Sequence, residues 1–234
     1  MRDYIRPTNL AELPDMMRDI MGWDASLWSR ASVPAYPCLI DQNHVVAELY
    51  DMVNVPTAVW IDESGRMVRP PEPAGSSDGF RAMDPTTFQI PKEAAEDGKR
   101  RRQVYVSALR DWIEKGSASV HALSADEVRR RTRGPTRDHA LAAANFRIGA
   151  YLHRTGHPEE SQKYLDEALR LRPESWDYRR QQIVLSDPAL TGQFAATPEY
   201  WQAVMALGDG FYYPPIEMHG MPEPFHPNKL RGRA

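Results

Sequence analysis

The sequence predicts an α/β protein that is mostly helical. Residues 1–91 are rich in proline and in short segments, and they contain one pair of strand-like runs. Residues 92–234 have almost continuous helical periodicity to about residue 207 and end in a proline-rich tail. We therefore expect two regions, with a boundary near Pro91.

Composition narrows the class of protein. The 234 residues are 41% hydrophobic and 26% charged, which suffices for one substantial core or two small ones. There is no apolar run long enough to span a membrane and no signal-peptide core at the start, so we expect a cytoplasmic protein without membrane contact. The net charge of -3 argues against nucleic acid as a partner, and we interpret the basic run Lys99–Arg102 as a solvated helix face.

The first region begins with helical and extended signals. Asn9 and Glu12 have the spacing of a capping box ahead of an apolar helix face. Residues 35–41, AYPCLID, are expected to be extended because two X-Pro steps oppose helix there. In residues 44–53, HVVAELYDMV, the apolar side chains recur on one face, which predicts an amphipathic helix.

A strand pair follows this helix. Residues 57–62, TAVWID, predict a buried strand, and a turn containing Gly65 leads to residues 66–69, RMVR, as the hairpin partner. Asp41 and Asp62 end extended segments and could form a carboxylate pair. We favour surface turns for both.

The order of segments from Tyr36 to Pro70 resembles the back half of a thioredoxin-like domain of the bacterial ResA and TlpA type. The shared features are an extended Y-P-x-L-I-D, a helix ending in L-Y, a V-P-T step, a strand ending in W-I-D and a turn with glycine. The resemblance implies that Pro56 follows a cis peptide bond, and that Val55, Pro56 and Thr57 offer a backbone edge to an extended substrate or partner. The alternative is a trans proline that opens an edge strand.

The chain departs from this family where the catalytic motif would stand. The resemblance implies a strand, a Cys-x-x-Cys motif at a helix N-terminus and a further strand before Tyr36, but Cys38 is the single cysteine. Cys38 lies in an apolar segment without a basic neighbour, so a small buried hydrophobe is favoured over a redox or resolving thiol. We therefore expect no catalysis by this chain alone and no cofactor.

Three arrangements would account for the missing strands. A second copy or another chain could supply them, since an open hairpin edge is normally covered. The N-terminal helix and the helical region could instead cover the hairpin. Finally, the chain could be the back part of a thiol or selenol oxidoreductase whose active-site segment lies upstream. The chain resembles larger bacterial redoxins, some of which carry selenocysteine in the active-site motif. Because selenocysteine is encoded by a stop codon, a reading frame that starts at an internal methionine would begin downstream of the active site.

One unit in the second region, residues 142–175, resembles a tetratricopeptide repeat. Gly149 and Ala168 would permit two antiparallel helices to approach closely, Gly156 would lie in the turn, and Pro173 would end the second helix. About three repeats are needed for an independent solenoid, and we find one copy, so we expect it to pack on its neighbours.

Other helices and the tail complete the prediction. Helices are expected over about residues 92–115, from a capping box at Ser124, after Pro173, and from Thr197 onward. The tail, residues 211–234, is expected to lie as a strap over the helical region. Its possible functional residues are the metal candidates His219 and His226 and the exposed aromatics Phe211, Tyr212 and Tyr213.

Together these features favour a thioredoxin-like, TPR-containing protein that acts in thiol redox metabolism by binding a protein partner or forming a homodimer. The oxidoreductase described above is the first alternative. A metal-handling protein that uses the methionines and histidines of the tail is the second.

Overall fold

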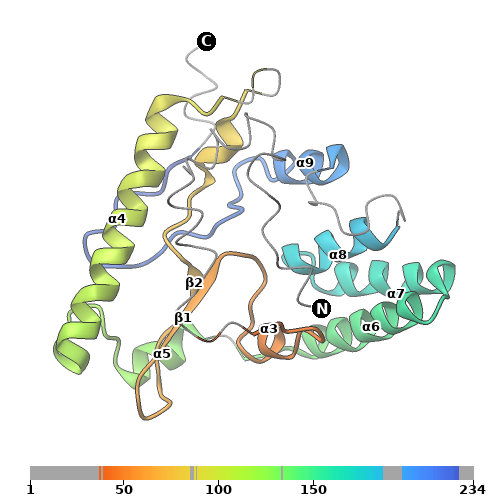
Figure 1. Cartoon of the computed structure of the whole chain (residues 1–234), viewed down its shortest axis with the longest axis horizontal. Coiled ribbons are helices and arrows are strands. Elements are labelled where there is room, and N and C mark those ends of the chain that lie inside the picture. The colour runs from red at the N-terminus through yellow and green to blue at the C-terminus, as the bar shows by residue number, and fades with distance from the viewer. Residues whose placement is uncertain are drawn as a thin grey trace. The chain divides into compact units, whose positions relative to one another are not determined.

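The computed structural model describes residues 37, 39–84, 87, 89–132, 134–186 and 197–226. By its internal contacts the chain divides into two compact units, Met1–Gln42 and Asn43–Ala234. The strands and helices described below belong to the second unit, within which the boundary expected near Pro91 falls (Figure 1). The secondary structure is mostly helical with a small two-stranded sheet, which confirms the predicted class at this level.

An antiparallel hairpin is formed by β1 (Thr57–Ile61) and β2 (Met67–Pro73). Trp60 lies opposite Arg69, and the register is irregular on either side of Trp60. Gly65 adopts a φ of 80° in the turn, a conformation that favours glycine. The predicted hairpin is confirmed, and β2 continues beyond RMVR because prolines are tolerated in an edge strand.

One face of the hairpin packs on the long helix α4 (Lys92–Lys115). The indole N–H of Trp60 donates to the hydroxyl of Tyr105 at 2.8 Å, and its ring stacks on Trp112 with 5.1 Å between centroids. The same cluster contains Ala108, Ile216 and Met218. The helix expected for residues 92–115 is therefore confirmed, and side chains of the tail pack on its apolar stripe. The sequence pattern also places Ile113 on this stripe, which is wrong because Ile113 is 69% exposed.

Arginines join this core to the C-terminal segment, residues 208–226. Arg69 is 1% exposed, is paired with the carboxylate of Glu72, and donates to the carbonyl of Glu217 in that segment. Arg101 is paired with Asp97 and donates to two other carbonyls of the segment. The solvated face predicted for the Lys99–Arg102 run is therefore wrong for Arg101, because the C-terminal segment covers it.

The helix α3 (Val45–Leu49) is shorter than the helix predicted for residues 44–53. It follows His44 and precedes Asp51, whose φ values are 56° and 55°. Left-handed backbone cannot continue a right-handed helix, so these two residues limit its length. No residue of α3 is buried, and its apolar side chains Val45, Val46 and Leu49 are exposed. The predicted helix is therefore present but shorter, and its apolar side chains are exposed in the part of the chain that the structure describes.

The remaining helices follow the predicted order. They are α5 (Ala125–Arg131), α6 (Arg137–Arg154), α7 (Pro158–Leu171), α8 (Trp176–Ser186) and α9 (Pro198–Met205). The predicted caps are confirmed, since the hydroxyls of Ser124 and Thr197 each accept the backbone N–H three residues on, at 3.2 Å. Among the described helices, none is both long and apolar enough to cross a membrane.

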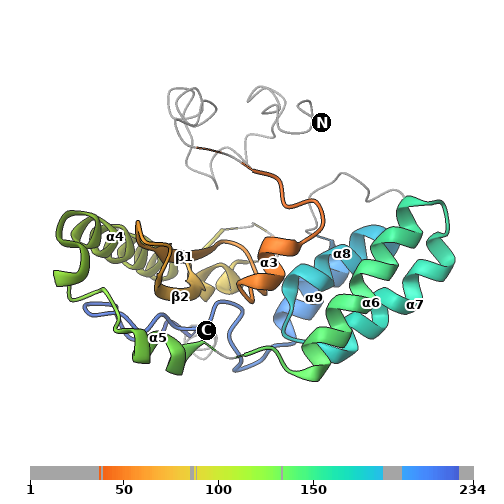
Figure 2. The ribbon, with the colours of Figure 1, turned by 90° about the horizontal axis from the view of Figure 1, so that it is seen from below.

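Helices α6 and α7 lie side by side as a tightly packed pair (Figures 1 and 2). The hydroxyl of Ser161 donates to the carbonyl of Gly149 at 2.8 Å. A Cβ atom at Gly149 would lie 2.8 Å from the buried side chain of Leu165. The rings of Phe146 and Tyr178 stack with 4.5 Å between centroids and join α8 to the pair. The close approach predicted from small residues is therefore confirmed.

We expect Gly149→Ala to destabilise the protein by about 1 kcal/mol, because overpacking against Leu165 outweighs the better helix propensity of alanine. Gly98→Ala in α4 is the matched control. Its added Cβ meets its nearest neighbour at an ordinary 3.5 Å, so we expect a gain of about 1 kcal/mol. Urea unfolding of both variants measures the difference, and equal shifts would contradict the tight α6–α7 contact.

Candidate functional site

The segment before β1 is held by the buried side chain of Asn54. Its amide N–H donates to the carbonyl of Tyr212 at 3.1 Å. Its side-chain oxygen accepts from the guanidinium of Arg180 at 2.7 Å and from the N–H of Val55 at 2.9 Å. One amide thus connects the start of β1, α8 and the C-terminal segment. The Val55–Pro56 peptide bond that follows is cis, as the sequence predicts.

The N-terminus of α8 holds the same segment from another side. The backbone N–H groups of Trp176 and Asp177 donate to the carbonyl of Val53 at 2.7 and 3.2 Å. The first N–H groups of a helix have no partner within the helix, so an external carbonyl satisfies them. Residues 53 and 54 are therefore fixed by backbone and side-chain contacts together.

The backbone of the V-P-T step is already engaged. The N–H of Val55 donates to Asn54, and its carbonyl accepts the hydroxyl of Tyr213 at 3.1 Å. The hydroxyl of Thr57 donates to the carbonyl of Asn54 at 2.5 Å. The side chains of Val55, which is 56% exposed, and Pro56 face outward. An extended partner that used the carbonyl of Val55 would first have to displace Tyr213.

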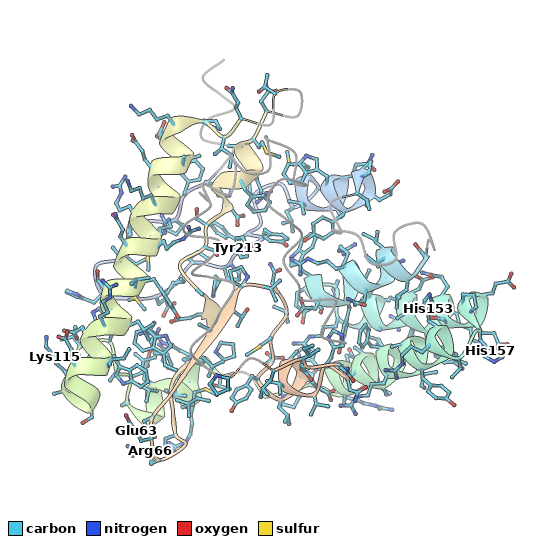
Figure 3. The ribbon with its side chains drawn as sticks, in the orientation of Figure 1. Glu63, Arg66, Lys115, His153, His157 and Tyr213 are labelled. Atoms are coloured by element: carbon cyan, nitrogen blue, oxygen red, sulfur yellow. The ribbon has the colours of Figure 1, made fainter. Side chains whose placement is uncertain are left out.

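Tyr213 belongs to a buried group of phenols. In Figure 3 it lies in the centre of the view, whereas His153 and His157 lie far from it along the α6–α7 pair. The carboxylate of Asp78 accepts the N–H groups of Tyr212 and Tyr213 at 2.8 and 2.7 Å. Burial raises the pKa of Tyr213, so its hydroxyl is protonated and donates at neutral pH. Tyr212 is 4% exposed, so the prediction of an exposed aromatic is wrong for it.

The second feature of this region is the free edge of β1. Among the residues that the structure describes, β1 pairs with β2 alone. Ala58 and Trp60 contribute to the core against α4, whereas Ile61 is exposed. Figures 1 and 2 show α3, with its exposed apolar residues, beside the start of the hairpin. An unpaired strand edge with apolar neighbours is a surface suited to binding another strand.

Asp62 lies in the hairpin turn, which agrees with the interpretation as a surface turn. Its carboxylate accepts the hydroxyl of Ser64 at 2.6 Å and the backbone N–H of Arg66 at 2.9 Å. The Ser64 hydroxyl first, and then the Arg66 N–H, lower the pKa of Asp62 to about 2. Asp41 belongs to the other compact unit.

The remaining candidates from the sequence are not brought together. His219 lies 6.1 Å from the ring of His121, whereas the Nε2–H of His226 donates to the carbonyl of Asp209 at 2.9 Å. In the described ranges, no three side chains of His, Cys, Asp or Glu are grouped as a metal site. Cys38 lies outside the residues that the structure describes.

The contacts that build this region leave almost no local signal in the sequence. Asn54 contacts Arg180 across 126 positions and Tyr212 across 158. Neither partner falls in a motif with fixed spacing, so no pattern could pair them. A polar residue placed just before the V-P-T step is the one local cue, since a buried amide needs several partners.

The chain matches no family model, and it matches neither a curated protein nor a solved structure. The thioredoxin-like and tetratricopeptide interpretations therefore rest on the sequence motifs. The hydrogen bonds, burial and open strand edge described above stand independently of them.

We expect Asn54→Ala to destabilise the protein by about 2–3 kcal/mol, because it removes three hydrogen bonds and leaves buried partners unsatisfied. Asn145→Ala is the control. Its amide makes a single exposed contact within α6, so we expect a change within about 0.5 kcal/mol. Thermal and urea unfolding measure both, and similar values for the two variants would contradict the role given to Asn54.

We expect Ser64→Ala to raise the pKa of Asp62 from about 2 toward its ordinary value, because it removes the largest cause of the lowering. A lowered pKa stabilises the fold above the unfolded-state pKa, and this contribution is lost as the pH falls toward about 2. Carboxyl carbon NMR titration measures the midpoint. An unchanged midpoint in the variant would show that the hydroxyl does not bind the carboxylate.

Proposed function

We propose that the chain is the back half of a thioredoxin-like domain, in residues 1–91, joined to a helical extension with one tetratricopeptide-like unit, in residues 92–234. It acts as a non-catalytic module of thiol redox metabolism that binds a protein partner or a second copy of itself. The observation that carries this proposal is the unpaired edge of β1 among the described residues.

The composition of the two strands supports this use of the edge. Proteins normally protect an open strand edge with proline or charge. The strand β2, MVRPPEP, has both proline and charge. The carbonyl of its Val68 also accepts the N–H of Leu123 at 3.3 Å. The strand β1, TAVWI, has no proline and no charged residue. The edge of β1 therefore has the chemistry of a strand that pairs with another.

A second copy of the chain would satisfy this edge by symmetry. Two β1 strands that pair across a twofold axis would form one four-stranded sheet from two hairpins. The main-chain hydrogen bonds would supply affinity, and the exposed apolar residues beside the edge, such as Leu49 and Ile61, would be buried with it. A strand from a different protein would use the same donors and acceptors.

We expect the wild-type protein to form a dimer, of twice the 26.7 kDa chain mass, as its concentration is raised to about 100 µM. The double variant Leu49→Lys/Ile61→Lys should weaken the dimer at least about tenfold, because it places two charges in the proposed interface. Analytical ultracentrifugation over a concentration series measures the dissociation constant.

Ile113→Lys is the matched control, because Ile113 is equally apolar and 69% exposed but lies in α4 near Met67 and Val68 of β2, and not on the edge of β1. Its dissociation constant should equal that of the wild type. A chain that stays monomeric and reduces insulin in a Cys38-dependent manner would overturn the proposal in favour of the oxidoreductase. Loss of that activity in Cys38→Ser would identify the thiol.

A further inference from the structure

A cavity of about 450 Å³ lies between α8, α9 and the C-terminal segment. Its walls are mainly apolar and include Val53, Trp176, Leu207, Phe211 and Pro214. Sites for small organic ligands are usually of about 300–1,000 Å³, with apolar walls and a few polar groups that fix the orientation. The size and the lining of this cavity agree with that description.

One cationic side chain, Arg179 of α8, lines the cavity. Its guanidinium stacks over the ring of Trp176, with the central carbon 5.3 Å from the ring centroid. Its Nε is buried and has no hydrogen-bond partner. Burial lowers the pKa of Arg179, but a guanidinium remains protonated in proteins, so a charged donor lines the cavity at every physiological pH.

Arg179, which is partly buried, differs in its lack of a partner from the fully buried arginines. Arg69, Arg81 and Arg101 are each paired with a carboxylate within 3.0 Å. Within the described part of the chain, no carboxylate lies in ion-pair range of Arg179. Partial removal of a charge from water without a partner is costly, so an anion that enters the cavity would gain by pairing with this guanidinium.

The carboxylate nearest to the cavity is not available to Arg179. Glu174 also lines the cavity, but its carboxylate lies 3.3 Å from the ring of His139 and 3.5 Å from the guanidinium of Arg172. It is half exposed and contributes negative charge at the rim. A ligand with one carboxylate would therefore be favoured over one with several.

We propose that this cavity binds a small monocarboxylic acid with an aromatic or branched apolar body. The carboxylate accepts hydrogen bonds from the in-plane N–H groups of Arg179, which the stacking on Trp176 leaves free. The body of the ligand packs against Leu207 and Phe211. This site is distinct from the edge of β1, and it does not depend on the function proposed above.

The test is isothermal titration of the full chain with 4-phenylbutyrate and 3-indolepropionate, each compared with its primary amide. We expect the wild type to bind the acids saturably and at least about tenfold more tightly than the amides, because a charge-assisted hydrogen bond is lost in the amide. Arg179→Met should remove this preference while the apolar cavity remains. Arg170→Met, which removes an exposed arginine of α7, should retain it.

A second variant tests the cavity without touching the arginine. Ala206 is exposed at the cavity rim at the end of α9, so Ala206→Phe should preserve the fold, checked by circular dichroism, and block both acids and amides. The proposal is overturned if neither acid binds saturably below about 10 mM, or if acids and amides bind equally. It is also overturned if Arg179→Met keeps the preference, or if folded Ala206→Phe binds as well as the wild type.

Discussion

The irregular C-terminal segment, residues 208–226, can be buried because side chains supply the donors that its carbonyls lack. Outside helices and strands, a buried carbonyl needs a partner from elsewhere. Arg69, Arg81 and Arg101 each donate to carbonyls of this segment, and Asn54 donates to another. Each of these arginines also holds a carboxylate, so its own charge is compensated. The segment thus lies against the core with several of its carbonyls satisfied by side chains.

This arrangement explains how the C-terminal segment joins the hairpin and α4 to the helix α8. Ile216 and Met218 pack with Trp60 and Tyr105 of the hairpin and α4, whereas Tyr212 packs with Trp176 of α8. Asn54, which precedes β1, contacts Tyr212 of the segment and Arg180 of α8, and it thereby ties the start of the hairpin to the second cluster. The position of the strand β1 is consequently set by polar contacts at its start and by apolar contacts along one face. Its free edge is thus held in place by the buried side chains of Asn54 and Trp60.

Local patterns predicted the elements but not the contacts between them. The helix over residues 92–115, the capped starts at Ser124 and Thr197 and the hairpin all follow from periodicity and turn chemistry, which act within a few residues. The solvated face expected for Lys99–Arg102 is wrong at Arg101, and the helix expected at residues 44–53 is shorter and leaves its apolar side chains exposed, because burial depends on distant segments. Arg101 donates to the carbonyls of a segment more than 120 positions away, and that segment covers it. None of the residues of α3 is buried. The Asn54 and Arg179 environments are long-range in the same way.

The two surfaces proposed as functional share one physical feature, which is a main-chain edge or a charged side chain that lacks a partner of the matching kind among the described residues. The carbonyl of Val53, the backbone of Val55 and the buried carboxylate of Asp78 all have partners. The Nε atoms of Arg81 and Arg172 also lack a hydrogen-bond partner, but both of these arginines are paired with a carboxylate, whereas Arg179 has no such pairing in the described part of the chain. Chains are expected to leave a strong donor or acceptor unpaired where another molecule completes it. The unpaired main-chain edge of β1 would bind another strand, and the unpaired guanidinium of Arg179 would bind an anion. The two sites therefore select different classes of ligand.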